Sequence, residues 1–290
     1  MSVEELVPRG EGQAHRTAYD DETRARLAAD AAQIVARYPQ ERSALLPMLH
    51  LVQAEDGYVS PRGIAFCAAT LGLTTAEVSA VATFYTQYKR HPNGDYTVGV
   101  CTNTLCAVMG GDAIWEHLCE HTGVGHDETT PDGKVTLERV ECNAACDYAP
   151  VVMVNWEFLD NQTPQSAAAV VDALRAGEKV VPTRGADEVV TFKEMSRVLA
   201  GFLDGRADEG VGAGAATVRG TVLAREKGWS APAFPGDQPA TGTGARAAAS
   251  AAVPQPGDEQ SSAERPATTA RDVSPEQQER KQAASDAKEQ

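Results

Sequence analysis

Two close pairs of cysteines constrain this chain more than any other feature of its sequence. The pairs hold four of the six cysteines, as C-x4-C at Cys101 and Cys106 and as C-x3-C at Cys142 and Cys146. Each pair follows a strand candidate, so the loop after each strand is able to turn two thiolates toward one point. Four converging thiolates are the ligand set of a [2Fe–2S] cluster and also of a structural zinc ion. Only a fold that brings the two loops together satisfies this requirement.

The spacing of the cysteines favours iron–sulfur without excluding other interpretations. Zinc ribbons generally use C-x2-C pairs, and both gaps here are longer. A thiol–disulfide oxidoreductase requires C-x-x-C, which the sequence lacks. The plant-type ferredoxin spacing, C-x4-C-x2-C, is also different. From spacing alone we rank a [2Fe–2S] cluster first and a structural zinc site second, and cysteines without a shared role remain a third interpretation.

The composition excludes some classes of partner and compartment. The chain carries 26 Lys and Arg against 41 Asp and Glu, a net charge of −15, and has no basic stripe that would predict nucleic-acid binding. The opening segment MSVEELVPRG lacks the features of a signal peptide, and no apolar run approaches the roughly 18 residues that suggest a membrane span. We expect a cytoplasmic protein without direct membrane insertion. In that reducing compartment, close cysteines favour metal or redox chemistry over disulfides.

Helical periodicity dominates the first third of the chain. After a predicted flexible arm over residues 1–19, apolar residues recur at helical spacing through residues 20–90, which predicts a helical bundle. Ser60 followed by a proline, and Thr74 with Glu77 three residues later, are helix-start signals. The residues of the last helix that we expect to be buried, within the bundle or against the next domain, are Val78, Val81, Ala82, Phe84 and Tyr85. A partner-facing role for one of Phe84 and Tyr85 is the alternative.

The period changes after residue 94, and the expected elements then follow the order β-α-β-β-α over residues 95–177. Strands are expected at residues 96–100, 135–141 and 151–154, and helices at residues 112–121 and 163–177. This order predicts a compact α/β sandwich, which we place at residues 91–185. The first two strands end at the two cysteine pairs. Pro150, next to the third strand, is a candidate cis proline.

The remainder of the chain divides into an extension and a tail. We expect residues 186–235 to hold a short helix over residues 191–203. Residues 222–223 and 228–234 are expected either to dock on a partner as an extended strip or to form a solvated linker. Residues 236–290 have too few large apolar side chains to offset the entropy of ordering, so we predict a disordered tail.

Four stretches of the sequence also resemble a known family. They are, in chain order, Arg42–His50 (RSALLPMLH), Val81–Thr86 (VATFYT), Val100–Cys106 (VCTNTLC) and Val140–Pro150 (VECNAACDYAP). The chain over residues 20–177 resembles the small thioredoxin-like [2Fe–2S] subunit of bacterial NADH:quinone oxidoreductase, the respiratory complex I. This combination is far more specific than either cysteine pair alone, and with it the iron–sulfur interpretation displaces zinc.

The resemblance implies an α+β fold, in which an N-terminal helical bundle precedes a thioredoxin-like α/β domain and the disordered tail follows. It implies that one [2Fe–2S] cluster is bound by Cys101, Cys106, Cys142 and Cys146. The chain is then an electron-transfer subunit of an oxidoreductase, without a complete active site of its own. FMN and NADH are expected on a flavin-binding partner subunit, a large iron–sulfur subunit is the second expected partner, and the complex holds the chain at the inner face of the cell membrane. In agreement, the sequence has no G-x-G-x-x-G after a strand and no P-loop.

The chain departs from the family at Asn143-Ala144, where Leu-Gly is more common, and we expect this change to influence the cluster potential. Equivalent subunits of NAD-linked hydrogenases or formate dehydrogenases, and a zinc-binding scaffold, remain alternative functions. The other candidate residues are expected to be structural or exposed. They are Cys67 in the core, Cys119 as a structural residue, and His117, His121, His126, Glu138 and Glu141 at the surface.

Overall fold

The computed structural model describes residues 18–231. The predicted disordered tail at residues 236–290, and all but the end of the predicted arm at residues 1–19, lie outside the described residues. Tyr19 contradicts its assignment to the arm, because its side chain is 7% exposed and its hydroxyl donates to Asp56 Oδ2 at 2.8 Å. The packed part of the chain therefore begins before residue 20.

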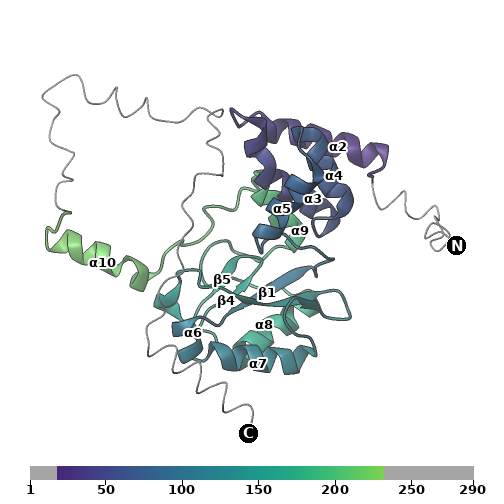
Figure 1. Ribbon diagram of the computed structural model, residues 1–290. Coiled ribbons are helices and arrows are strands. Elements are labelled where there is room, and N and C mark those ends of the chain that lie inside the picture. Colours follow the sequence, from purple (N-terminus) through teal and green to yellow (C-terminus); the bar gives the residue numbers. More distant parts are fainter. Residues whose placement is uncertain (1–17, 232–290) are drawn as a thin grey trace, which may run out of the picture. The chain divides into compact units, whose positions relative to one another are not determined.

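A helical bundle forms the N-terminal part of the structure, as predicted. It contains α2 (Asp21–Val35), η3 (Glu41–Ala44), α3 (Leu45–Asp56), α4 (Pro61–Leu71) and α5 (Thr75–Phe84) (Figure 1). The predicted start signals act locally: Ser60 Oγ accepts from the Gly63 N–H at 3.0 Å, and Thr74 and Glu77 form a reciprocal capping box. The largest fully buried side chains of the bundle are Leu27, Ile34, Met48, Leu49, Leu51, Val52 and Gln53.

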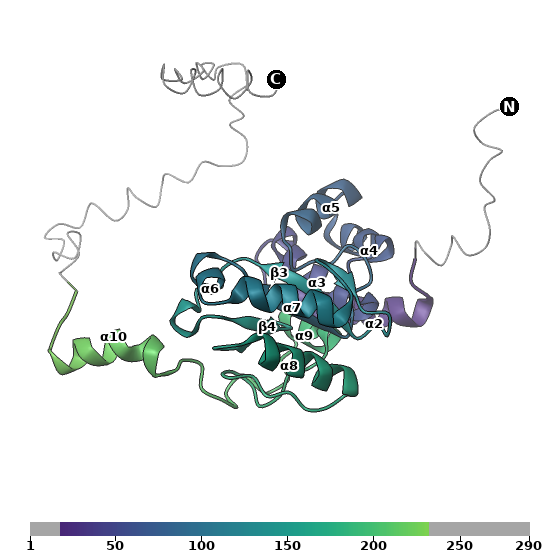
Figure 2. The ribbon, with the colours of Figure 1, turned by 90° about the horizontal axis from the view of Figure 1, so that it is seen from below.

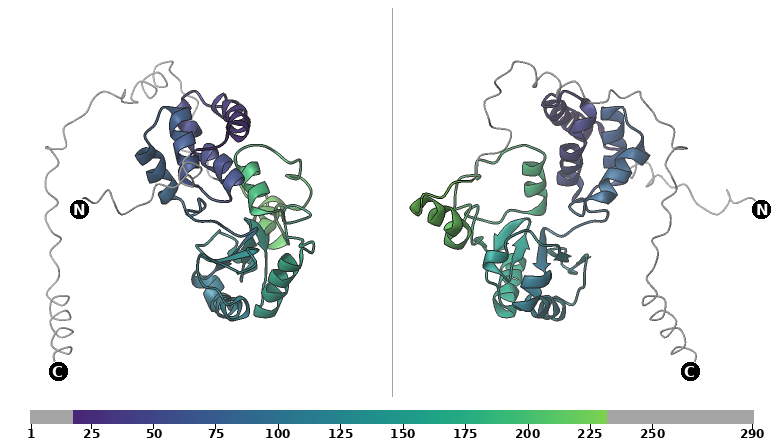
Figure 3. Two further views of the ribbon diagram at one scale, coloured as in Figure 1. Left: turned by 90° about the vertical axis from the view of Figure 1, so that its right-hand side faces the viewer. Right: turned by 60° about the vertical axis from the view of Figure 1, so that its left-hand side comes forward.

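The short helix of the extension belongs to this bundle rather than standing apart from it. Helix α9 (Phe192–Leu199) lies beside α3, far from it in sequence (Figure 3). Gln53 Nε2 donates to Ser196 Oγ at 3.3 Å inside the contact, and Arg197 Nη1 donates to Asp30 Oδ2 at 2.8 Å at its edge. The chain thus returns from the α/β part to complete the first core.

The second part of the structure is built on one sheet. Its strands are β1 (Tyr96–Cys101), β2 (Glu128–Thr129), β3 (Val135–Val140), β4 (Val152–Val154) and β5 (Glu157–Leu159), in the spatial order β2-β3-β1-β4-β5. Strands β1 and β3 are parallel, and the other neighbours are antiparallel. The strands β2 and β5 were not expected, because two or three residues are too short for a periodic pattern.

Helices cover one face of this sheet. They are α6 (Thr104–Val108), α7 (Gly111–Thr122) and α8 (Pro164–Ala176), and Figure 2 shows α7 and α8 together on the side away from the bundle. The core between them and the sheet includes Val98, Val100 and Leu137 from the strands, and Leu118 and Val171 from the helices. The predicted α/β sandwich is confirmed, with its helices on one face.

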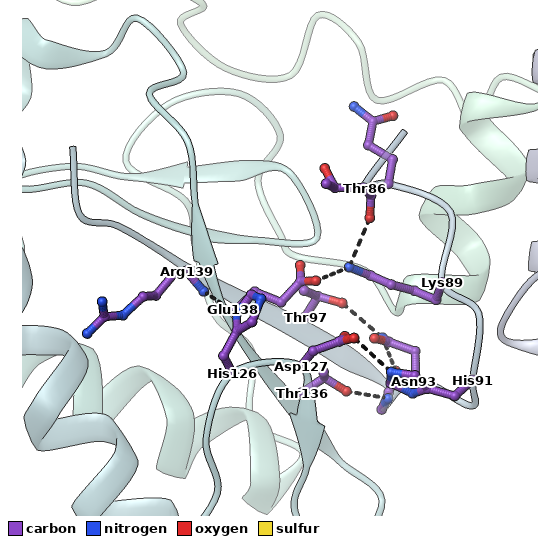
Figure 4. Close-up of polar contacts among 12 residues, drawn as sticks. Thr86, Lys89, His91, Asn93, Thr97, His126, Asp127, Thr136, Glu138 and Arg139 are labelled. Atoms are coloured by element: carbon purple, nitrogen blue, oxygen red, sulfur yellow. Dashed lines mark hydrogen bonds and ion pairs between the residues drawn. The ribbon is translucent and has the colours of Figure 1, made fainter. Parts of the chain in front are cut away.

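Buried polar contacts join the bundle to the sheet (Figure 4). The Lys89 side chain, 4% exposed, pairs through its ammonium with the Glu138 carboxylate on β3 and donates to the Thr86 carbonyl at 3.3 Å. The Lys89 N–H donates to Gln53 Oε1 at 2.8 Å. The predicted surface position of Glu138 is therefore wrong, because this carboxylate is the counter-charge of a buried lysine.

Two other expectations are corrected. Phe84 and Tyr85 are exposed, at 78% and 44%, rather than packed between the two parts. Residues 222–223 lie in a helix, α10 (Ala215–Glu226), in which no residue is buried, whereas either an extended strip or a solvated linker was expected there. The strip's end at Phe234 lies outside the described residues. Within residues 18–231 no single helix is long and apolar enough to cross a membrane. Helices α4 and α5 reach that length and apolar character only when counted together, and the chain bends sharply between them.

Removing one partner of the buried ion pair is expected to destabilise the chain. Lys89→Met leaves the Glu138 carboxylate without its counter-charge, at a cost of about 3 kcal/mol in the free energy of unfolding. Urea denaturation measures this loss. The matched control is Lys134→Met, since the Lys134–Asp95 pair is exposed and is expected to contribute about 1 kcal/mol or less. Equal losses in the two variants contradict the structural role of Lys89.

Candidate iron–sulfur site

Parallel pairing brings the two cysteine loops to one edge of the sheet. Cys101, the last residue of β1, lies in register with Val140, the last residue of β3, and Cys142 follows two residues later. Because adjacent parallel strands end at the same edge, the loops after them begin side by side. The antiparallel strand β4 starts at this edge too, and the Val151 carbonyl accepts the Cys101 N–H at 3.1 Å.

The four thiols of this edge are free and lie as two pairs. The sulfurs of Cys142 and Cys146 are 3.3 Å apart, and the side chains of Cys101 and Cys106 are buried together in one apolar cluster. Among residues 18–231, no three His, Cys, Asp or Glu side chains are grouped to hold a metal ion between them. A [2Fe–2S] cluster makes a different demand, because each of its irons takes two protein ligands. Two neighbouring pairs of thiols fit that demand.

The environment of the thiols is divided between core and solvent. Cys101 and Cys106 are 4% and 3% exposed, Cys146 is half-buried and Cys142 is exposed. Around them lies a small apolar cluster that includes Ala145, Val151 and Met153, with Val140, Ala149, Trp156 and Phe158 packed against it. This cluster shields one side of the site from water and leaves the Cys142 side open.

The electrostatics of the site call for a positively charged occupant. The pKa of Cys101 is raised to about 11, mainly by burial and in part by the neighbouring thiols of Cys106 and Cys142. The hydrogen bond between the Cys142 and Cys146 thiols is the largest cause that raises the pKa of Cys146. Four adjacent thiolates repel each other, so a bound metal group that supplies positive charge is needed to deprotonate them together. The donor set is chemically suited to iron.

Close packing fixes the first cysteine loop. Gly111, the first residue of α7, lies directly against this loop, where an added Cβ would be 2.5 Å from the Cys101 carbonyl oxygen and 2.9 Å from that of Cys106. No larger side chain fits without a backbone shift. Cys106 itself lies within α6, so strand, helix and glycine together restrain this loop.

The second loop contains a strained residue, Ala144, at the position where the resemblance led us to expect glycine. Ala144 has φ +55°, in the left-handed region that costs a residue with a Cβ roughly 1–2 kcal/mol. Glycine carries no such penalty. The Ala149–Pro150 peptide bond after this loop is cis, as expected.

Helix α10 contacts the second loop, which the sequence did not indicate. The short helix η4 (Cys146–Tyr148) carries the last cysteine. The Tyr148 hydroxyl accepts the Ala216 N–H at 3.0 Å, and the Thr217 hydroxyl donates to the Asp147 carboxylate. Two residues that follow Cys146 therefore hold the start of α10. Their types alone carry no signal for a contact with residues some 70 positions away.

The remaining candidate residues lie apart from the four thiols or have structural roles. Cys67 is fully buried in the bundle core, as predicted, and Cys119 packs against the core of the sheet. His121 Nε2 contacts Asp172 Oδ1 at 2.7 Å, and the His126 ring accepts the Arg139 N–H at 3.0 Å. None of these side chains is part of the site formed by Cys101, Cys106, Cys142 and Cys146.

Comparison with known proteins identifies the family. The family model of the thioredoxin-like [2Fe–2S] ferredoxins matches residues 31–175. The chain belongs to this family. It is 63% identical over 219 residues to the E subunit of the NADH-quinone oxidoreductase of Mycobacterium tuberculosis, covering 75% of this chain and 86% of the relative. It is 38% identical over 148 residues to NADH-quinone oxidoreductase subunit 2 of Thermus thermophilus, covering 50% of this chain and 82% of the relative.

A solved structure with partial similarity is an NAD+-reducing [NiFe]-hydrogenase. Its similarity is 20% in sequence, with a TM-score of 0.42, over 46% of this chain and 23% of the hydrogenase chain. The identification rests on the family match and on the mycobacterial and Thermus relatives, whose own length this chain largely spans.

Relief of the strain at Ala144 is expected to stabilise the chain. Ala144→Gly removes the clash of the Cβ with the backbone at positive φ, and the expected gain in the free energy of unfolding is about 1 kcal/mol. Chemical denaturation of the metal-free chain measures it. The control is Ala145→Gly next to it, where φ is −101° and the added backbone freedom is expected to destabilise the chain. A loss of stability in both variants contradicts the strain argument.

Proposed function

We propose that Cys101, Cys106, Cys142 and Cys146 bind one [2Fe–2S] cluster, and that the chain is the electron-transfer subunit of an NADH:quinone oxidoreductase. The observation that carries this proposal is the 63% identity to the mycobacterial relative over 86% of its length, together with two pairs of free thiols at one sheet edge. When bound, such a cluster accepts and releases one electron at a time.

The residues of the site have distinct roles in this proposal. Cys101 and Cys106 hold the buried side, where the apolar cluster excludes water and lowers the local dielectric. Cys142 and Cys146 hold the side nearest to solvent, through which an electron is able to pass to a partner. No side chain acts as acid, base or nucleophile, so the chain's contribution is to bind, orient and shield.

We propose further that the flavin-binding subunit that carries FMN and NADH docks on this exposed side, with the large iron–sulfur subunit as a second neighbour. A cleft of about 530 Å³ supports a docking surface, since it runs from Tyr85 in the bundle to Asn143 in the second cysteine loop. The exposed Phe84 lies at the bundle end of this region. Through that assembly the chain is held at the inner face of the membrane.

The domain boundaries of this proposal follow the sequence. With the start moved to include Tyr19, residues 19–90 form the bundle, residues 91–185 the domain that carries the cluster, and residues 186–235 the extension. The extension supports both, because α9 completes the bundle core and α10 contacts the turn after Cys146.

The cluster is tested by its composition and its spectrum. The purified chain is expected to contain two irons and two acid-labile sulfides, and to give a rhombic EPR signal after dithionite reduction. Cys142→Ser is expected to alter or abolish that signal, because oxygen replaces a thiolate ligand. Cys119→Ser is the matched control, since Cys119 lies in α7 away from the site. Zinc without iron, or a signal that changes in Cys119→Ser but not in Cys142→Ser, contradicts the assignment.

The partner is tested by co-expression with a subunit that carries FMN. Co-purification and reduction of the EPR-active cluster by NADH are expected only when both chains are present. A Phe84→Asp variant is expected to weaken the association while leaving iron content unchanged, because Phe84 is exposed and distant in sequence from the cysteines. A chain that is reduced by NADH without any partner contradicts this part of the proposal.

A further inference from the structure

We propose that Asn103 is a positioning residue that ties the two cysteine loops together and fixes Cys142 relative to Cys101. This inference rests on the proposed cluster site. Asn103 lies in the first loop, between the two cysteines of the C-x4-C pair. Its side chain reaches the second loop, where it contacts Glu141 and Cys142.

Both ends of the Asn103 amide are used in this contact. Asn103 Oδ1 accepts the Cys142 N–H at 2.9 Å, and Asn103 Nδ2 donates to Glu141 Oε2 at 3.0 Å. The asparagine side chain carries a carbonyl oxygen that accepts and an NH2 group that donates, both in one planar amide. The two bonds therefore restrain both the position and the orientation of the second loop where it begins.

The side chain gives up a local role to make these bonds. Asn103 is the N-cap residue of α6, with the extended backbone typical of that position. Asparagine is favoured at N-caps because its side-chain oxygen accepts an N–H of the first turn, yet here it makes no such bond. Only the backbone carbonyl of Asn103 serves the helix, by accepting the Ala107 N–H at 2.8 Å. The orientation of the amide thus favours contact between loops over capping.

The second loop depends on such a restraint more than the first. Cys142 lies beyond the last residue of β3 that pairs with β1, and its side chain is exposed. The left-handed Ala144 adds strain two residues later. Asn103 therefore supplies, from the first loop, a restraint that the second loop's own backbone lacks, and its loss is expected to change the position of Cys142.

The test uses a variant, a rescue and a charge control. Asn103→Asp keeps the acceptor for the Cys142 N–H but places a carboxylate against Glu141. Adding Glu141→Gln restores a donor opposite that carboxylate. Asn143→Asp adds the same charge in the second loop, where Asn143 contacts only the Glu141 carbonyl and bridges no loops. The measurements are iron and sulfide content, the g-values of the reduced protein, its midpoint potential and the rate of cluster loss.

The expected result separates positioning from charge. Asn103→Asp is expected to retain two irons and two sulfides when freshly prepared, with shifted g-values and cluster loss roughly 5- to 10-fold faster, as the loss of about one hydrogen bond predicts. The double variant is expected to return both properties toward wild type. Asn143→Asp is expected to shift the potential alone. Unchanged behaviour in Asn103→Asp, or equal effects of Asn103→Asp and Asn143→Asp on g-values and cluster loss, overturns the proposal.

A separate measurement distinguishes failure of this inference from failure of the cluster assignment. Amide hydrogen exchange at Cys142 in the metal-free chain reports the Asn103 hydrogen bond without any cluster. Asn103→Ser, whose hydroxyl is too short to reach the second loop, is expected to accelerate that exchange roughly 5-fold or more. If the wild-type chain binds no iron but Asn103→Ser still accelerates the exchange, the cluster assignment is refuted and the positioning role of Asn103 is retained. An unchanged exchange rate in Asn103→Ser refutes the positioning role of Asn103, whatever the iron content.

Discussion

The parallel pairing of β1 and β3 is the constraint on which the site depends. Their register places Cys101 opposite Val140, so a slip of two residues would displace one cysteine loop from the other by roughly 6–7 Å. Gly99 contributes to this register. An added Cβ there would lie 2.7 Å from Val140 Cγ1, so the absence of a side chain on β1 lets Val140 lie close across the strand. The sheet core, through α7 and α8, holds both strands in place.

The two parts of the chain are joined by polar groups that are buried and satisfied. Gln53 is fully buried in α3 and bonds to the Gln87 carbonyl, the Ser196 hydroxyl and the Lys89 N–H. These partners come from the linker and from the extension, so one amide connects segments before and after the sheet. Buried polar groups are costly unless they are paired, and therefore such a joint tolerates few alternative arrangements.

The sequence predicted most of this fold where the signals are local. Capping residues such as Thr74 and Thr163 mark helix starts by bonds within one turn, and both form capping boxes. The convergence of the two cysteine loops followed from strand ends and residue type. What the sequence could not indicate depends on contacts between distant segments. Glu138 has the same character in sequence whether it faces water or Lys89, and the exposure of Phe84 reflects which side of α5 the core occupies.

The two cysteine loops are held in place by different physical means. The first is restrained within its own segment, by β1, by α6 and by the close approach of Gly111. The second has little regular structure and carries a left-handed alanine, so its order comes from elsewhere in the chain. Asn103 holds it from one side, and α10 holds the turn after Cys146 from the other through Asp147 and Tyr148. A loop that is fixed by contacts from outside, rather than by its own backbone, keeps an exposed thiol in place while leaving that thiol accessible to a partner.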